Sequence, residues 1–369
     1  MVVFKDKKRV MYVARFIPFY REGILRRLTE LYDCRFICQD KQFGTGHSPD
    51  LPEIVRLPMK TYFGRLDWLP IRKQVKTFDP EVVISELGLS FVTVFCLLLG
   101  KFFHGYKLMF WTHGLEGPRK EGRMWVSDYI RKWILRFSDG VVYYTEGCAK
   151  VTQPYLGKLP YYVAPNTLDT DSLDLAWSKL EVDPVSFKPQ VVFIGRMVEA
   201  KRVRELLNLA QQLKDKKSSV RLIMIGDGPL RALLEKESQE RKLPIDWLGD
   251  ISDPDEKASL LACSLAGVCL GRVGLNIVDC LAFGLPLLTL KRQDLTSTHG
   301  PEIDYLIDGE TGWLCESPES VTMHIEDLNE NEKHRLGLRE SCRSYFESYC
   351  SIENQVKGII DAVENITHG

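Results

Sequence analysis

The chain has 369 residues, enough for two domains that each bury a core of their own. Hydrophobic residues make up 44% and charged residues 27%, with 27 glycines and 18 prolines; this excludes a disordered, collagen-like or coiled-coil chain. The 49 basic and 50 acidic side chains give a net charge of −1, which argues against a protein that binds nucleic acid. A charged partner must therefore be met by a local patch.

Ten cysteines are spread along the chain without a CxxC pair. Several lie in apolar runs, so we expect reduced core cysteines rather than a disulfide framework or a zinc site. The N-terminal residues lack the apolar segment of a signal peptide. The longest uncharged stretches, 87–100 and 258–271, span 14 residues each, which is too short for a membrane helix. These features predict a cytoplasmic protein.

The first half of the chain alternates between short β-rich runs and helical patterns. A helix is expected over 23–32 and a loop over 43–52. Strands that alternate with helices favour a parallel sheet covered by helices on both faces. The predicted strands are 9–15, 34–38, 81–87, 107–114, 140–146 and 161–166.

A second series of the same kind follows an irregular, polar segment at 167–189, where we place a domain linker. The predicted fold is therefore α/β, with two doubly wound domains in tandem. The predicted strands of the second series are 191–195, 221–228, 245–249, 265–271 and 285–290. Its predicted helices are 203–213, the residues after Pro229, 317–349 and 352–366.

The strand predicted at 191–195 ends in Gly195-Arg196, and Lys201 follows five residues after Arg196. Ligands of open α/β sheets bind at the carboxyl ends of strands, where two cations can clamp a diphosphate. The alternative is a solvated strand end that binds nothing.

A second glycine motif, Gly226-Asp227-Gly228, follows the next predicted strand. It matches half of the GxGxxG fingerprint of dinucleotide-binding proteins, but Arg231 stands where the third glycine belongs. A tight turn with Pro229 in the first helical turn explains the motif. No NAD site is therefore predicted.

A third motif, GRVGLNIVDCLAFGLP at 271–286, places a glycine turn before a short helix. Backbone N–H groups at such a helix start can hold phosphate oxygens. Asp279 follows about a turn and a half later, where its carboxylate can accept hydrogen bonds from ribose hydroxyls. A fourth motif, THGPEI at 298–303, precedes 307–314, which is expected to form a turn before a strand.

Taken in order, GR-x4-K, GDGPLR, WLG, GLNIVDCLAFGLP and PEI-x4-DGETGWL resemble the motifs of family 4 (group 1) glycosyltransferases of the GT-B fold. The nearest resemblance is to bacterial enzymes that assemble envelope polysaccharides, among them lipopolysaccharide. It covers about 190–315 and is weaker over 1–170. It implies two Rossmann-like domains that face a cleft: an acceptor-side domain over 1–170, completed by a helix at 350–369, and a nucleotide-sugar domain over 171–349.

The resemblance assigns the donor site to the second domain. Arg196 and Lys201, after Gly195, match the residues that clamp the donor phosphates and act in catalysis. Gly274 and Leu275 match the turn whose amides meet the diphosphate.

The family's E-x7-E motif is incomplete in this chain. Asp279 matches its second, ribose-facing carboxylate, but Gly271 stands where the first glutamate belongs. The nucleotide base is expected beside Gly226, Gly249 and Asp250.

In the first domain, His113 of the WTHG segment matches the catalytic histidine that faces the donor sugar. The segment 15–21 replaces the family's glycine-rich loop, and its Arg21 is expected on the acceptor side. A further departure is Arg202, which replaces the glycine that usually follows the lysine.

The resemblance implies retaining, metal-independent transfer from a UDP- or GDP-linked sugar to a glycan or lipid-linked acceptor. No DxD motif lies beside the donor segments and no His/Asp cluster has ligand spacing, so neither a metal nor a cofactor is expected. Two alternatives stay open. Gly271 favours a non-catalytic GT-B-like subunit of a glycosyltransferase complex, and a GT-B sugar-nucleotide epimerase would share the phosphate clamp.

Residues 119–137 combine an aromatic stripe with positive charge. Trp125, Tyr129, Trp133 and Phe137 recur every four residues, which places them on one side of a helix. Six basic and two acidic residues give the segment a net charge of +4. Such a helix can lie on an anionic leaflet, so peripheral membrane association is a hypothesis. The alternative is that the stripe packs on the sheet, as is expected of the apolar run 91–99.

Overall fold

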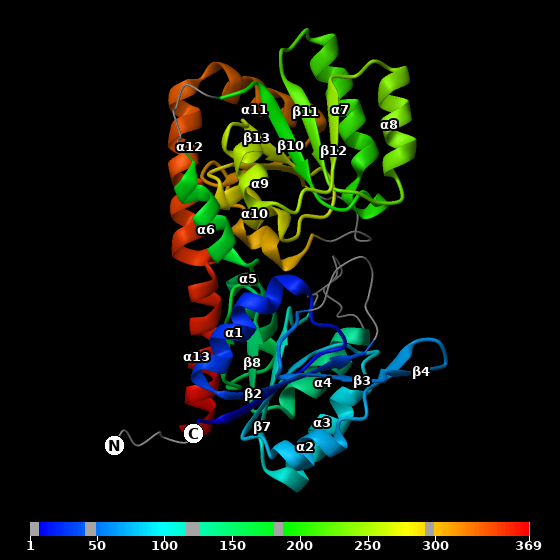
Figure 1. Cartoon of the computed structure of the whole chain (residues 1–369), viewed down its shortest axis with the longest axis vertical. Helices are drawn as coiled ribbons and strands as arrows, with labels where there is room; N and C mark the ends of the chain where they lie inside the picture. The colour runs from blue at the N-terminus through cyan, green and yellow to red at the C-terminus, as the bar shows by residue number, and fades with distance from the viewer. Residues whose placement is uncertain (1–6, 41–48, 116–125, 181–186, 292–298, 369) are drawn as a thin grey trace. The chain divides into compact units, whose positions relative to one another are not determined.

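The structure is a computed structural model that describes residues 7–40, 49–115, 126–180, 187–291 and 299–368. The chain forms two compact units, coloured along the sequence in Figure 1. Unit 1 comprises Met1–Asp169 and Ile352–Gly369, and unit 2 comprises Thr170–Ser351. The end of the chain therefore returns to the unit in which the chain began.

Unit 1 is built on a parallel sheet in the order β3-β2-β1-β6-β7-β8-β9. Its strands are mostly continuous apolar runs, because helices cover both faces of a parallel sheet. The strand order reverses between β1 and β6, and ligands of such sheets bind at the carboxyl ends of the strands at this point. The strands are β1 (Arg9–Val13), β2 (Asp33–Gln39), β3 (Ile54–Leu57), β6 (Val82–Glu86), β7 (Lys107–Thr112), β8 (Gly140–Tyr143) and β9 (Tyr161–Val163).

Two groups of helices cover this sheet (Figure 1). The apolar sides of α1 (Glu22–Leu31) and α13 (Ile352–His368) pack against one face. Those of α2 (Arg72–Phe78), α3 (Thr93–His104) and α4 (Val126–Arg136) pack against the other. Right-handed crossovers produce this arrangement when the chain leaves β1 in one direction and β6 in the opposite direction. α5 (Glu146–Thr152) follows β8.

Unit 2 repeats the plan with a parallel sheet in the order β12-β11-β10-β13-β14-β15, which reverses between β10 and β13. Among its helices, α7 contacts α8 and α11, and α10 contacts α6 and α12. The strands are β10 (Gln190–Ile194), β11 (Arg221–Ile225), β12 (Ile245–Gly249), β13 (Ala266–Val268), β14 (Leu287–Leu290) and β15 (Gly312–Cys315). The helices are α6 (Thr170–Lys179), α7 (Val203–Asp215), α8 (Arg231–Glu240), α9 (Pro254–Ala262), α10 (Asn276–Ala282), α11 (Pro318–Glu330) and α12 (Glu332–Tyr345).

The predicted α/β class is confirmed, and each predicted strand has a counterpart in one of the two sheets. The sequence analysis missed β3 and an antiparallel hairpin of β4 (Lys60–Tyr62) and β5 (Leu66–Trp68). These strands are three or four residues long and partly or fully exposed, so they lack the apolar runs that mark the buried strands. Residues 43–48, most of the predicted loop over 43–52, lie outside the described residues.

The prediction of an irregular linker over 167–189 is wrong for α6, which occupies Thr170–Lys179. Leu173 and Ala176, three residues apart, are buried, and the ring of Trp177 lies 4.9 Å from the guanidinium of Arg343. The polar residues of this segment are the outer side of an amphipathic helix. The helix belongs to unit 2 rather than to a connection.

All ten cysteines are free thiols, and most are buried. Burial raises the pKa of the Cys34 thiol to about 12, so it stays protonated at neutral pH. None of the helices in the described ranges is long and apolar enough to cross a membrane.

One close contact fixes α13 on the sheet of unit 1. A Cβ atom at Gly358 would overlap the carbonyl oxygen of Val163 and lie 2.7 Å from the Cα of Ala164. The helix and the end of β9 therefore meet backbone to backbone. A glycine in the middle of a helix has a conformational cost. Glycine is nevertheless required at position 358, because no side chain fits there.

We predict that Gly358→Ala destabilises the protein by about 2 kcal/mol or more, despite its higher helix propensity, because overpacking outweighs propensity. Urea unfolding measures the change. The matched control is Gly337→Ala in α12, where no atom lies within 4 Å of the new methyl group. That control should gain about 0.5–1 kcal/mol. Stabilisation by both alanines would contradict the backbone contact.

Candidate functional site

Three glycines bring the ends of β10, β11 and β12 together. The Gly195 N–H donates to the Ile225 carbonyl at 3.0 Å, and the Gly226 N–H donates to the Gly249 carbonyl at 2.7 Å. Gly226 has φ +124°, and a Cβ atom there would overlap the Gly195 carbonyl oxygen. The predicted residues Gly195, Gly226 and Gly249 thus form one floor of bare backbone at the carboxyl edge of the sheet. Asp250 follows this floor with an exposed side chain.

Lys201 lies over the same edge. Its Nζ is 3.9 Å from the Cβ position of Gly195 and 4.0 Å from that of Gly274. It donates to Asn276 Oδ1 at 3.1 Å, and the Gly274 N–H donates to the same oxygen at 3.0 Å. The structure therefore brings together the predicted strand end, the lysine and the glycine turn, at the point where the strand order reverses.

Asn276 is a residue that the sequence analysis missed. Its amide oxygen accepts from both Lys201 and the Gly274 N–H, and its side chain is buried. An anion that takes the Gly274 amide must displace this oxygen, whereas Lys201 can donate to an anion at the same time. The signal in the sequence was the polar residue inside the apolar run of GLNIVDCLA.

The two predicted cations carry no acidic partner. Arg196 is exposed, and neither it nor Lys201 forms an ion pair within the part of the chain that the structure describes. The neighbouring Arg202, by contrast, lies 3.6 Å from Glu205. Two unpaired cations at the carboxyl edge of a sheet make this edge attractive to a diphosphate.

The carboxylate of Asp279 forms an ion pair with Lys257. Its Oδ1 lies 3.1 Å from the Nζ of Lys257 on α9, and the carboxylate is largely buried on α10. The sequence analysis named no partner for Asp279, because Lys257 comes from an element 22 residues away.

The THGPEI segment packs against the glycine turn. His299 Nδ1 accepts from the Val273 N–H at 3.2 Å, and the Gly300 N–H donates to the Val273 carbonyl at 2.7 Å. The tautomer that fits these contacts carries its proton on Nε2, which lies 3.3 Å from the Leu290 carbonyl. The buried Glu302 lies beside Gly300. His299 and Glu302 were not predicted as site residues, although their motif was noted.

Gly271, the departure from E-x7-E, is enforced by packing. A Cβ atom there would overlap the carbonyl carbon of Lys201 and lie 2.5 Å from the Ala200 carbonyl oxygen. The Arg272 N–H donates to that same oxygen at 2.8 Å. The segment that carries Lys201 therefore occupies the volume that a glutamate at 271 would need.

Unit 1 holds the two remaining predicted residues. His113 follows β7 with an exposed ring, and its Nδ1 lies 3.3 Å from the Gly114 carbonyl oxygen. Arg21 is buried and lines a cavity of about 590 Å³ at the carboxyl ends of β1 and β6, where the strand order of this unit reverses. Tyr12 and Tyr144 form part of its aromatic wall.

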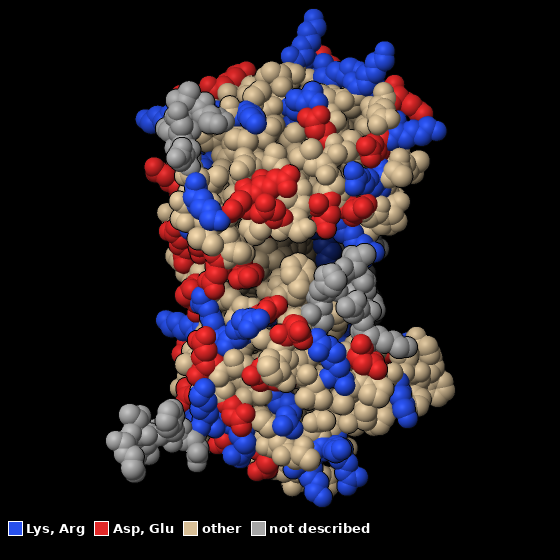
Figure 2. All heavy atoms as spheres, viewed as in Figure 1, with Lys and Arg blue, Asp and Glu red and all other residues tan. Residues whose placement is uncertain are grey.

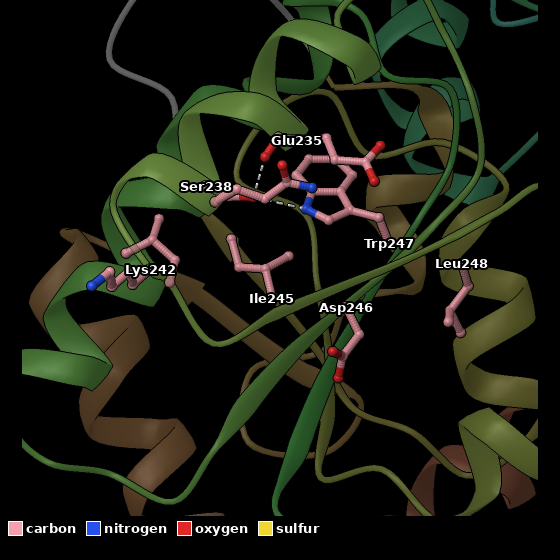
Figure 3. Close-up of a pocket in the computed structure, with 9 residues that line it drawn as sticks. Glu235, Ser238, Lys242, Ile245, Asp246, Trp247 and Leu248 are labelled. Atoms are coloured by element: carbon pink, nitrogen blue, oxygen red, sulfur yellow. Dashed lines mark hydrogen bonds between the residues drawn. The ribbon is translucent and has the colours of Figure 1, made fainter.

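A second hollow, of about 410 Å³, lies at the outer edge of unit 2 between α8 and β12 (Figure 3). The indole of Trp247 crosses it and donates to Ser238 Oγ at 3.0 Å, with Lys242 and Asp246 around its rim. None of the predicted site residues lines this hollow. Among the described residues, no group of three or more His, Cys, Asp or Glu side chains could hold a metal ion.

Residues 182–345, most of unit 2, match the family described as glycosyl transferases group 1. Over unit 2, the chain is therefore similar to the group 1 glycosyltransferases. The chain is 29% identical over 150 residues to a GDP-mannose-dependent alpha-(1-6)-phosphatidylinositol dimannoside mannosyltransferase of Mycobacterium tuberculosis. That match covers 39% of this chain and spans only 37% of the relative's length.

A 2-deoxystreptamine glucosyltransferase of Streptomyces kanamyceticus is 28% identical over 210 residues, or 54% of each chain. Among solved structures, Anabaena HepE in complex with UDP matches 97% of this chain and 100% of its own chain, with a TM-score of 0.69 at 14% identity. At that identity the likeness is one of fold, and it confirms the GT-B prediction.

We predict that Gly271→Glu, which restores the family's carboxylate, destabilises unit 2 by roughly 2–3 kcal/mol, because the added side chain meets backbone rather than a mobile side chain. The melting temperature measures the loss. Gly274→Ala is the matched control, since its nearest neighbour is Lys201 Nζ at 4.0 Å. A melting temperature unchanged by the glutamate would contradict the packing found here.

Proposed function

We propose that the protein is a retaining, metal-independent glycosyltransferase that takes its sugar from a UDP- or GDP-linked donor. The observation that carries the proposal is the convergence of Lys201 with the Gly195 and Gly274 turns, without an acidic partner within the described residues. This arrangement suits a diphosphate. The Mycobacterium relative is named as dependent on GDP-mannose, and HepE was solved with UDP, which supports a nucleotide-sugar donor.

In the proposed reaction, the bond between the sugar's anomeric carbon and the diphosphate breaks, and the acceptor hydroxyl bonds to the same carbon from the same face. The departing phosphate oxygen takes the hydroxyl proton. Negative charge grows on the diphosphate as the bond breaks, and Arg196 and Lys201 stabilise it. His113 of unit 1 is proposed to contact the donor sugar, as the resemblance implies.

The nucleoside is proposed to lie on the floor formed by Gly226 and Gly249, with Asp250 near the base. Asp279 would accept from the ribose hydroxyls. Lys257 supports this role, because its contact to Oδ1 fixes the carboxylate and leaves the second oxygen for the ligand.

The acceptor is proposed to be a glycan or a lipid-linked sugar of envelope-polysaccharide assembly, reached from the cytoplasmic face of the membrane. An exposed apolar surface on unit 1 supports the proposal of a lipid-linked acceptor. Trp133 and Tyr129 of α4 are 53% and 58% exposed, so the alternative that this stripe packs on the sheet is wrong for these residues. Trp125 lies outside the described residues.

α3 extends this surface. Phe102 and Phe103 are 70% and 83% exposed, and Lys101 donates to the Phe137 carbonyl at 3.2 Å, which places the end of α3 beside the end of α4. The expectation that the run 91–99 is core holds for Phe91 but is wrong for Leu99, which is exposed.

The same helices carry several cations, of which Lys101 is paired with Asp139. The acidic residue on the described parts of α2, α3 and α4 is Asp128, which is buried and paired with Arg131. Lys and Arg side chains gather at the lower end of unit 1 in Figure 2, where Figure 1 labels α2 and α3. An apolar surface on helices that also carry cations suits an anionic leaflet. The cations of these helices are Arg72, Lys73, Lys76, Lys101, Arg131, Lys132 and Arg136.

A second candidate is a non-catalytic GT-B-like subunit, which Gly271 favours because no carboxylate fits at that position. A sugar-nucleotide epimerase shares the phosphate clamp but needs several carboxylates at the sugar. Slow hydrolysis of UDP- or GDP-sugars by the purified protein separates a transferase from a non-catalytic subunit, and an epimerised donor would identify the third possibility.

We predict that Arg196→Ala and Lys201→Ala each cost about 2–4 kcal/mol of transition-state stabilisation, mostly as a lower kcat, since the charge they meet grows during bond breakage. Release of UDP or GDP from the donor measures the rate. Lys216→Ala, an exposed cation paired with Glu326 at the far end of α7, is the control and should keep full activity. An unchanged kcat in both site variants would defeat the assignment.

We predict that the protein sediments with anionic but not with neutral liposomes, and that binding weakens as salt rises through about 0.15 M, where screening acts within about 8 Å. Phe102→Ser with Phe103→Ser, or Lys132→Glu with Arg136→Glu, should abolish sedimentation. The control pair Leu175→Ser with Leu233→Ser removes exposed leucines of unit 2 and should bind as the wild type does. Wild-type protein that stays in the supernatant at low salt would refute membrane docking.

A further inference from the structure

The cavity of unit 1 contains a buried cation without a counterion. Arg21 ends a short 3-10 turn before α1, and its side chain is only 6% exposed. Its guanidinium carbon lies 3.9 Å from the centre of the Trp111 ring and 5.8 Å from that of Tyr144. It lies over the ring of Trp111, with Tyr144 beside it, rather than against a carboxylate.

The polar contacts of Arg21 leave part of its charge unsatisfied. Nη2 lies 3.5 Å from Asn166 Oδ1, at the limit of a hydrogen bond. Nη1 is buried and has no hydrogen-bond partner, and no acidic side chain of the described residues pairs with this arginine. A group with five donors in a fixed plane normally fills them when it is buried.

The acidic groups of the cavity are already engaged by another arginine. Arg15 Nε donates to Glu86 at 2.6 Å, and its Nη1 lies 3.8 Å from Asp67 and donates to Ser90 Oγ at 3.0 Å. Tyr12 offers no negative charge, because burial raises its pKa far above the usual range and keeps the phenol neutral. The charge on Arg21 is therefore left over after every acidic group of the cavity has been assigned.

An uncompensated buried charge is costly, and contact with aromatic rings offsets only part of that cost. A bound anion would offset the rest of the cost of burying this charge. Phosphate and carboxylate both fit the planar fork of a guanidinium, with two parallel hydrogen bonds.

The shape of the cavity fits a small polar ligand. Its volume of about 590 Å³ is in the range of small-molecule sites, and it lies at the carboxyl ends of β1 and β6, where the strand order reverses. Phe16, Tyr20 and Tyr144 line it together with Gln39 and Glu86, so aromatic faces and hydrogen-bonding groups are both present. Such a lining suits a sugar ring that carries an anionic group.

We infer that Arg21 binds a phosphate or carboxylate group of the acceptor, so that the acceptor is an anionic sugar or glycan. That the bound molecule is the acceptor rests on the proposed function. The anion site itself lies in unit 1 and does not depend on that function. Phosphate would come from a sugar phosphate or a lipid-linked sugar, and carboxylate from an acidic sugar.

Calorimetric titration of the full chain tests the inference with three probes: glucose 1-phosphate, glucuronate and neutral glucose. UDP is kept at saturation so that the donor site is filled. We expect at least one of the two anions to bind at least tenfold more tightly than glucose, and the tighter one identifies the source of the charge. Failure of both anions to exceed glucose would overturn the inference.

Two variants separate this site from the donor site. Arg21→Met keeps the length of the side chain and should weaken anion binding at least tenfold without lowering the melting temperature, because it removes an unpaired buried charge. Lys201→Ala should keep anion binding at unit 1 and lose UDP binding. A methionine variant that binds anions as the wild type does, or that melts lower, would show a structural role for Arg21. Wild-type protein that binds the anion through Arg21 but binds neither UDP nor GDP would defeat the proposed function alone.

Discussion

The donor site of unit 2 depends on how closely its backbone segments approach one another. Gly195 and Gly226 touch backbone to backbone, and the segment that ends in Lys201 rests directly on Gly271. A side chain at Gly226 or Gly271 would separate these segments and move Lys201 Nζ away from the strand end and the glycine turn. The position of the cation therefore follows from the absence of side chains beneath it, more than from any contact made by the lysine itself.

The same constraint accounts for the departures from the family pattern. A glutamate cannot occupy position 271 while residues 200–201 hold their place. Arg202, where the family usually has glycine, adopts a left-handed conformation with φ +49° and pairs with Glu205. A left-handed residue other than glycine costs on the order of 1 kcal/mol, and the ion pair offsets part of this. The family's preference for glycine at 202 thus has a backbone cause.

Both units use the reversal of strand order in a parallel sheet to place a cation. In unit 2 it is Lys201, between β10 and β13, and in unit 1 it is Arg21, beside β1 and β6. Arg15 and Lys257, which lie near these positions, have acidic partners. An unpaired cation at a crevice where helices no longer cover the strand ends marks the place where the fold can accept an anion.

The sequence by itself determined the two sheets, because buried parallel strands must be apolar runs and the glycine turns between them have few other uses. The motifs around Lys201 could be identified one by one in the sequence, and the resemblance to GT-B glycosyltransferases implied that they share one site; the pairing of β10 with β13 brings them together. Only the tertiary structure decided the contacts between distant segments. These include the contact of Asn276 with Lys201, that of Lys257 with Asp279, and the stacking of Arg21 on an aromatic ring instead of a carboxylate. Periodicity along one helix cannot show whether its apolar side meets a sheet or solvent. That is why α6 was mistaken for a linker and the exposure of α3 went unrecognised: burial is set by what packs opposite a residue, not by its neighbours in sequence.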